Sequence, residues 1–142
     1  VDHVVLDKFE RGKGVVNEDI LEYSPAEQFD LILSISTFEH IGFDDEADGD
    51  SGKKIRRAIT ACQALLADAG HLVLTLPLGY NPALDAMIAG DQLQSDRAFF
   101  IRRTGRLQWE PTTAEVVLDC RYGSPFPYAN AVMVAEFGRA AV

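Results

Sequence analysis

The stretch that decides the fold is Phe29-Asp-Leu-Ile-Leu-Ser-Ile-Ser-Thr-Phe-Glu-His-Ile-Gly-Phe43. Its first half contains an apolar run from Leu31 to Ile35, which is typical of a strand buried on both faces in a parallel sheet covered by helices. The polar residues that follow, from Ser36 to His40, would then lie beyond the carboxyl end of this strand. Because α/β sheets bind their ligands at that edge, we predict a functional site there.

The length and composition indicate one globular domain over residues 1–142, with 47% hydrophobic and 25% charged residues. No apolar run approaches the roughly 18–20 residues of a membrane span, and no secretory signal is visible, so we expect a cytoplasmic protein without a membrane partner. The formal net charge of −9 argues against nucleic acid as a partner, since phosphate binding needs clustered cations. A local basic patch remains open, because four arginines lie close together in the sequence: Arg97, Arg102, Arg103 and Arg106.

Neither the cysteines nor the acidic run predicts a metal site. Cys62 and Cys120 lack the spacing of metal or redox motifs, so we expect two reduced thiols. The run from Asp44 to Asp50 alternates acidic residues as a calcium loop does. However, its twelfth position is Ile55, where such a loop requires a bidentate glutamate. A solvated acidic loop is therefore the better interpretation.

Buried apolar runs alternate with helical patterns along the chain. Helical spacing predicts a helix from Lys53 to Ala67 that ends in a left-handed cap at Gly70. Asn81-Pro82 predicts the start of a helix that Gly90 ends. This alternation predicts an α/β fold with three layers around a mainly parallel sheet. The predicted strands cover residues 3–6, 29–35, 71–76, 98–103 and 131–137, and a further helix covers residues 113–120.

Three polar segments occur in a characteristic order: Asp7 after His3-Val-Val-Leu6, then Asp19-Ile20, then Ser36-Thr-Phe-Glu-His-Ile41 after its strand. This order resembles that of the class I S-adenosylmethionine-dependent methyltransferases. The resemblance implies a Rossmann-like fold and S-adenosylmethionine as cofactor. In this family an acidic residue after the second strand binds the ribose hydroxyls, a place that Asp7 matches, with Glu10 as the alternative. A carboxylate suits this task because it can accept two hydrogen bonds. A carboxylate that simply faces water remains open for Asp7.

The resemblance assigns two further parts of the cofactor site. Asp19 would meet the adenine amino group and Ile20 would pack on the adenine face, although a capping role for Asp19 stays open. Ser36 and Glu39 would lie in the loop beneath the methionine part of the cofactor. The segment Leu65-Leu-Ala-Asp-Ala-Gly-His-Leu-Val-Leu74 resembles the family's turn into its fifth strand.

The resemblance begins at the family's second strand. The glycine-rich turn after the first strand has no counterpart, because Gly12-Lys13-Gly14 lacks the third glycine and no helical pattern follows it. The resemblance therefore implies that the sheet lacks its first strand and helix and that the domain is incomplete at its N-terminus. A further segment, a second copy of the chain or another protein would then complete the sheet, since unpaired edges invite association.

The function that the resemblance implies is methyl transfer to a small-molecule acceptor, for which the protein mainly aligns donor and acceptor. His40 is the candidate base, since an imidazole titrates near neutral pH. A contact to cofactor or substrate and a purely structural role stay open for His40. The sequence does not identify the acceptor.

Two other classes of function also remain open. The chain could be a non-catalytic methyltransferase-like scaffold, or a nucleotide-binding α/β domain of another type. Aromatic side chains could line an acceptor pocket or belong to the core; they are Tyr80, Trp109, Tyr122, Phe126 and Tyr128.

Overall fold

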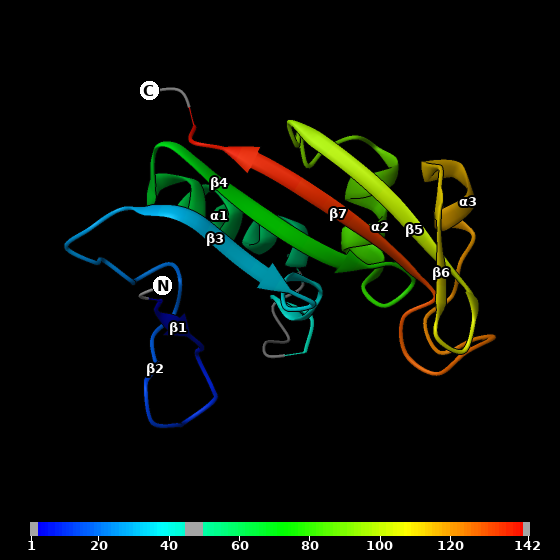
Figure 1. Cartoon of the computed structure of the whole chain (residues 1–142), viewed down its shortest axis with the longest axis horizontal. Coiled ribbons are helices and arrows are strands. Elements are labelled where there is room, and N and C mark those ends of the chain that lie inside the picture. The colour runs from blue at the N-terminus through cyan, green and yellow to red at the C-terminus, as the bar shows by residue number, and fades with distance from the viewer. Residues whose placement is uncertain (1–2, 45–49, 141–142) are drawn as a thin grey trace.

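The computed structural model describes residues 3–44 and 50–140, and its centre is a five-stranded sheet with the strand order β3-β4-β7-β5-β6 (Figure 1). The acidic run predicted as a solvated loop lies largely outside the described residues. A separate two-stranded parallel sheet precedes the centre and is formed by β1 (Val5–Leu6) and β2 (Val15–Val16). The central strands are β3 (Phe29–Ile35), β4 (Leu66–Pro77), β5 (Arg97–Gly105), β6 (Gln108–Thr112) and β7 (Ala131–Gly138). The helices are η1 (Phe38–His40), α1 (Ser51–Ala64), α2 (Pro82–Ala89) and α3 (Ala114–Leu118).

The α/β class is confirmed, but the expectation of a mainly parallel central sheet is wrong. β3 and β4 are parallel, with Ile32 opposite Leu72, whereas the β4–β7, β7–β5 and β5–β6 pairs are antiparallel. The reason is the path of the chain before β7. The chain enters β7 at the edge where β4 and β5 end, so β7 runs against both neighbours. β5 consequently runs in the same direction as β3 and β4.

The predicted helix over 53–67 is confirmed in its centre and wrong at its end. α1 stops at Ala64, and β4 already begins at Leu66. Gly70 lies inside β4 and does not cap the helix. A Cβ atom on Gly70 would lie 2.6 Å from the carbonyl oxygen of Phe29. Glycine is therefore required because the backbones of β3 and β4 approach each other closely at this point.

The other predicted elements are present with shifted ends. The strand predicted over 3–6 is reduced to Val5–Leu6, and it belongs to the small sheet. The helix that begins after Asn81 is confirmed. β6 was not predicted, because it is an edge strand that contains Pro111 and has no apolar alternation.

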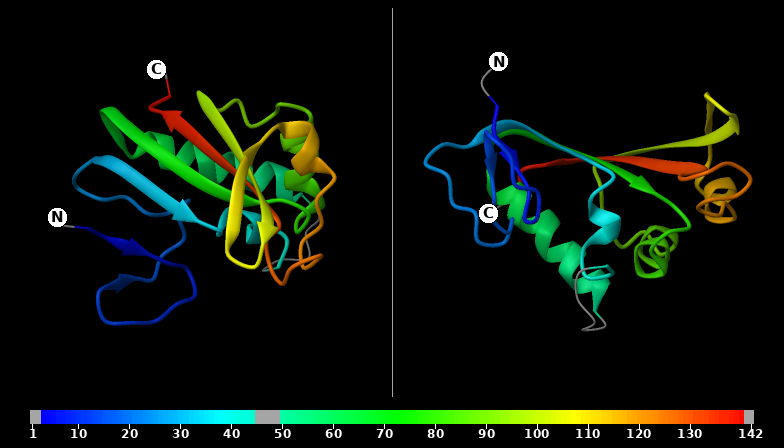
Figure 2. Two further views of the ribbon diagram at one scale, coloured as in Figure 1. Left: turned by 45° about the vertical axis from the view of Figure 1, so that its right-hand side comes forward. Right: turned by 90° about the horizontal axis from the view of Figure 1, so that it is seen from below.

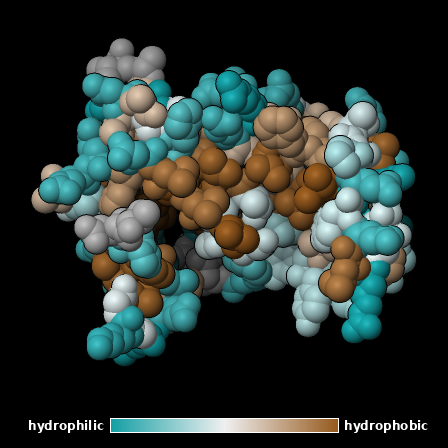
Figure 3. All heavy atoms as spheres, in the orientation of Figure 1, coloured by the Kyte–Doolittle hydropathy of each residue, from teal (hydrophilic) through white to brown (hydrophobic). Residues whose placement is uncertain are grey.

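The helices lie on one face of the central sheet (Figure 2). Side chains that alternate along β4 and β7, such as Leu72, Leu74 and Phe137, point to that face and form the core with α1. The helix-free face carries Leu31, Leu33 and Ile35 of β3, which are 56 to 64% exposed. Figure 3 shows a hydrophobic band across this face. The described residues thus build two layers of the predicted three.

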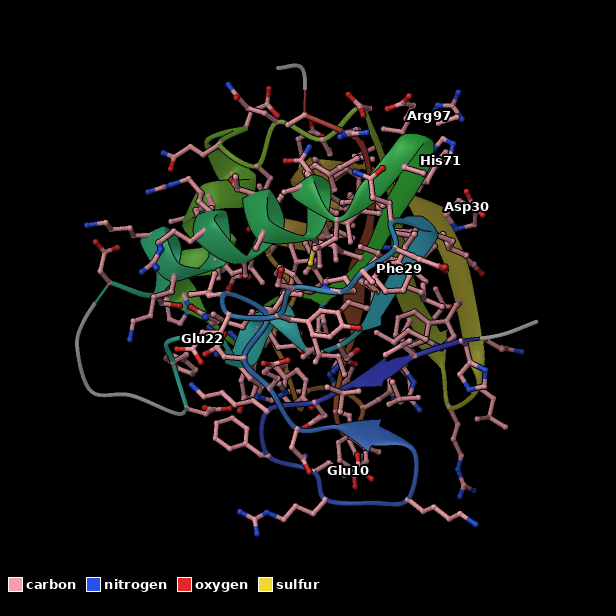
Figure 4. All side chains as sticks on the ribbon, turned by 90° about the vertical axis from the view of Figure 1, so that its left-hand side faces the viewer. Glu10, Glu22, Phe29, Asp30, His71 and Arg97 are labelled. Atoms are coloured by element: carbon pink, nitrogen blue, oxygen red, sulfur yellow. The ribbon has the colours of Figure 1, made fainter. Side chains whose placement is uncertain are left out.

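Charged residues gather at the amino-terminal ends of β3 and β5, where Figure 4 shows Asp30, His71 and Arg97. Glu136 joins the latter two, since its carboxylate lies 2.8 Å from His71 Nδ1 and 3.8 Å from Arg97. Exposed ion pairs of this kind contribute little stability. Within the described ranges, no helix is both long and apolar enough to cross a membrane.

Candidate functional site

The chain leaves β3 through Ser36, whose backbone is left-handed with a φ of 49°. The Ser36 N–H donates to the carbonyl oxygen of Thr75 at 3.1 Å and to its Oγ1 at 3.0 Å. These two bonds hold the strained residue against the end of β4. Strain at a non-glycine residue concentrates at functional sites, which agrees with the predicted position of the site.

Glu39 lies in η1 directly after this turn and is almost completely buried, with 3% of its surface exposed. Its Oε1 lies 3.6 Å from His40 Nε2, whereas its Oε2 has no hydrogen-bond partner among the described residues. Burial raises the pKa of the Glu39 carboxyl above its ordinary value. An unpaired buried carboxylate is costly, so this oxygen is suited to receive a hydrogen-bond donor or a cation.

His40 contacts Asp44 Oδ2 through Nδ1, and the hydroxyl of Tyr80 donates to the same oxygen at 2.7 Å. These interactions with His40 and Tyr80 lower the pKa of the Asp44 carboxyl. The bond to Asp44 raises the pKa of Tyr80 to about 12. The Tyr80 ring also meets the rings of His40 and Tyr122 edge-on, with 5.0 Å between centroids in each case. Asp44 and Tyr80 therefore fix the imidazole so that its Nε2 faces Glu39.

Asn81 connects this loop to the helices and is itself completely buried. Its side-chain nitrogen donates to the carbonyl oxygen of Glu39 at 2.8 Å and to Ser51 Oγ at 2.9 Å. Its side-chain oxygen accepts from the N–H groups of Ala83 and Leu84. The sequence pattern identified the helix cap but not the two donated bonds, because their partners lie 42 and 30 residues away.

Asp7 and Asp19 are brought together in the segment that contains the small sheet. The Asp7 Oδ1 accepts from the N–H groups of Phe9 and Glu10, which lowers the pKa of the Asp7 carboxyl. Asp19 is more fully engaged, since Oδ1 accepts from Leu21 N–H and Oδ2 lies 3.1 Å from the ammonium of Lys8.

These residues differ in how far they remain available to a ligand. Ile20 packs against the hydrophobic core, so part of its side chain is not free to cover an adenine. No hydrogen bond or ion pair within the described ranges links Asp7 or Asp19 to Ser36 or Glu39. The expectation that Asp7, Asp19, Ser36 and Glu39 belong to one cofactor site stays a prediction.

The five aromatic residues that could line an acceptor pocket separate into different surroundings. Tyr80 and Tyr122 belong to the ring cluster beside His40. Trp109 and Phe126 both contact the guanidinium of Arg103, at 5.9 and 5.0 Å from their centroids. Tyr128 is 75% exposed.

Among solved structures, the fold is similar to that of the class I S-adenosylmethionine-dependent methyltransferases. The N-methyltransferase NodS from Bradyrhizobium japonicum, solved with S-adenosyl-L-homocysteine, aligns over 97% of this chain and 66% of its own, with 17% identity and a TM-score of 0.51. An S-adenosylmethionine-dependent methyltransferase from Clostridium acetobutylicum aligns over 89% of this chain and 65% of its own, with 12% identity and a TM-score of 0.42. The chain thus spans just under two thirds of the length of either protein. No family model and no curated protein matches the sequence. The similarity to NodS concerns the fold: this chain shares the α/β fold of that methyltransferase.

Proposed function

We propose that this chain is part of a methyltransferase that transfers a methyl group from S-adenosylmethionine to a small-molecule acceptor. The observation that carries the proposal is the buried Glu39 carboxylate at the carboxyl end of β3, with one oxygen unpaired among the described residues. An ammonium group satisfies such an oxygen, and the methionine part of the cofactor carries one. NodS, whose fold this chain shares, was solved with the demethylated cofactor.

The residues present fit the cofactor to different degrees. Glu39 would hold its ammonium group, and Ser36 would border the methionine part at the turn out of β3. Asp7 would accept the ribose hydroxyls through Oδ2, since its backbone contacts occupy only Oδ1. Asp19 fits less well, because both of its oxygens already have partners.

S-Adenosylmethionine supplies a methyl group on a positively charged sulfur, so the protein has to align the acceptor and accept its proton. His40 is suited to the second task. Because Asp44 contacts Nδ1, the imidazole presents Nε2 to the side of the loop where Glu39 lies. Asp44 and Tyr80 serve as positioning residues that keep His40 in this orientation.

The open edge of β3 supports the expectation that a further segment completes the sheet. Backbone groups alternate along a strand, and the Ser36 N–H points to β4, so Leu33 and Ile35 direct their backbone groups to the open edge. The C=O group of Ile35 accepts from Thr37 Oγ1, so the N–H and C=O groups of Leu33 and the N–H group of Ile35 remain for pairing. Their side chains lie on the exposed apolar face. The same short segment therefore offers both backbone pairing and apolar contact.

We propose that a strand and a helix of the same polypeptide, outside residues 1–142, fill this place. The chain spans only 66% of NodS, so about a third of that protein has no counterpart here. A strand at the edge of β3 would also border Ser36 and would close the methionine side of the cofactor site.

Calorimetric titration with S-adenosylhomocysteine tests the function on the whole natural polypeptide and on residues 1–142. We expect the whole polypeptide to bind, and residues 1–142 to bind at least about tenfold more weakly, because the methionine side is open. Glu39→Gln in the whole polypeptide should weaken binding about tenfold or more, since the amide carries no charge for the ammonium.

Glu27→Gln is the matched control, because Glu27 is an exposed glutamate outside the candidate site. Absence of binding by the whole polypeptide would contradict the proposed function. Equal affinities of the two lengths would contradict the proposal that a further segment closes the site.

A further inference from the structure

A shallow cavity of about 590 Å³, open to solvent, lies between the end of β5 and the loop that connects α3 to β7. Its lining is basic, although the chain as a whole carries a formal net charge of −9. Three arginines and a single carboxylate contribute to it, together with polar groups of the loop. The charged and polar residues that define it are Arg102, Arg103, Asp119, Arg121, Ser124 and Asn130.

Arg103 lines the cavity, and its side chain is held in place by hydrogen bonds. Its guanidinium donates to the carbonyl oxygens of Gly105, Pro127 and Arg106, and it lies over the rings of Trp109 and Phe126. These partners are neutral, so they fix the position of the guanidinium without cancelling its positive charge.

Within residues 3–44 and 50–140, the guanidinium groups of Arg102 and Arg121 form no hydrogen bond or ion pair, although the charge of Arg102 acts on the nearby thiol of Cys120. Asp119 is the one acidic side chain in the lining, so the three arginines exceed it by two charges. Arg102 and Arg121 both line the cavity, and a guanidinium group favours a planar or tetrahedral oxyanion, which it can bind through two N–H donors.

Asn130 holds the loop of the cavity in shape. It is 2% exposed, and its side-chain nitrogen donates to the carbonyl oxygens of Arg121, Phe126 and Tyr128. Its side-chain oxygen accepts from Phe126 N–H at 3.1 Å. The hydrogen bonds of Asn130 thus order the loop that carries Arg121. An ordered loop loses less conformational entropy when a ligand binds to it.

The cavity lies on the same edge of the sheet as the candidate site. β5 runs in the same direction as β3, so Arg102 near the end of β5 is on the edge where Ser36 follows β3 (Figure 1). Tyr122, next to Arg121, contacts the Tyr80 ring that touches His40. A molecule anchored at Arg121 would thus extend along this edge towards His40.

We propose that this cavity binds an oxyanion, such as a carboxylate, phosphate or sulfate group, carried by the methyl acceptor. The acceptor assignment rests on the proposed function, whereas oxyanion binding does not. The acceptor class is then a small anionic molecule whose methyl-accepting atom lies on the His40 side of the anion.

Titration of the protein with inorganic phosphate, sulfate and acetate at constant ionic strength tests the proposal. Trp109 reports binding by fluorescence, since it is the only tryptophan of the chain and contacts Arg103. We expect saturable binding of at least one of these anions that weakens about tenfold in Arg121→Gln and in Arg102→Gln, which corresponds to about 1.4 kcal/mol. Backbone amide shifts in two-dimensional NMR should change around residues 119–126.

Arg56→Gln is the matched control, because Arg56 lines a separate basic groove with Lys53 and Arg57. Circular dichroism spectra of the variants verify that they fold. Absence of saturation with all three anions, or equal weakening by Arg56→Gln, would overturn the proposal. Cofactor titration distinguishes the two proposals. Binding of S-adenosylhomocysteine without anion binding contradicts only the proposal that the cavity binds an oxyanion. Anion binding without binding of S-adenosylhomocysteine contradicts only the methyltransferase assignment.

Discussion

The Tyr80 hydroxyl donates to Asp44 Oδ2, the same carboxylate oxygen that contacts His40 Nδ1. One exposed carboxylate thereby connects the loop after β3 with the loop after β4. Because the oxygen is shared, a change at Tyr80 is transmitted to the imidazole through Asp44. The relationship makes the protonation of Tyr80 a direct measure of the geometry around His40.

Asp44→Asn should lower the pKa of Tyr80 from about 12 towards its ordinary value of 10, because the negative charge beside the phenol is removed. Since the folded pKa exceeds the unfolded one, the associated stability is complete below about pH 10 and is lost as the pH rises through 12. Absorbance titration of tyrosinate measures the shift, and Tyr80→Phe identifies its contribution among the four tyrosines. An unchanged pKa would contradict the hydrogen bond.

Glu39→Gln should stabilise the free protein by about 1 kcal/mol at neutral pH and by less in acid, because it removes a buried negative charge. Burial raises the pKa of Glu39 in the folded state, so its penalty is absent below the ordinary value of 4.5 and grows as the pH rises through the folded pKa. Thermal unfolding at pH 4 and pH 7.5 measures the difference. Destabilisation at both pH values would show that Oε2 is satisfied in solution.

Asn81→Ala should cost about 3 kcal/mol or more, because it removes a helix cap and leaves buried partners without a hydrogen bond. Asn81→Asp is the informative control. It keeps the oxygen that accepts from Ala83 and Leu84 but loses the donors to Glu39 and Ser51. Urea unfolding should place the aspartate variant between the wild type and the alanine variant, and equal stability of all three would contradict the network.

Leu74→Ala and Leu33→Ala compare the two faces of the sheet. Leu74 is completely buried under the helices, so its truncation should cost about 2–5 kcal/mol. Leu33 is 56% exposed, so the same truncation in residues 1–142 should cost less than about 1 kcal/mol. In the whole polypeptide the cost at Leu33 should rise if a further segment covers this face. Chemical denaturation of both lengths measures the four values.

Sequence reasoning predicted those elements whose pattern is local. The apolar run of β3, the amphipathic core of α1 and the Asn81 cap were all visible in short windows. Gly70 was misread because a glycine after a helix is typical of a cap, whereas its function here depends on Phe29, 41 positions away. The pairing of β7 was likewise out of reach, since strand direction is decided by tertiary contacts and not by the residues of the strand.

The candidate site divides in the same way. Ser36, Glu39 and His40 were predicted as site residues because they directly follow an apolar strand. The sequence did not indicate that Asp44 and Tyr80 contact His40, because Asp44 belongs to an acidic run and Tyr80 to a different loop. Asp7 and Asp19 were assigned by family resemblance, and the structure places them near each other without joining them to Glu39.

The position of β7 in the middle of the sheet has a consequence for how the protein is made. Among the described strands, β7 comes last in the sequence, yet it separates β4 from β5 and supplies the backbone hydrogen bonds between the two halves of the sheet. Until residues 131–138 have been synthesised, the β3–β4 pair and the β5–β6 pair are separate two-stranded units with unpaired edges. The central sheet can therefore close only after this strand has been made, and its exposed edges favour association until then.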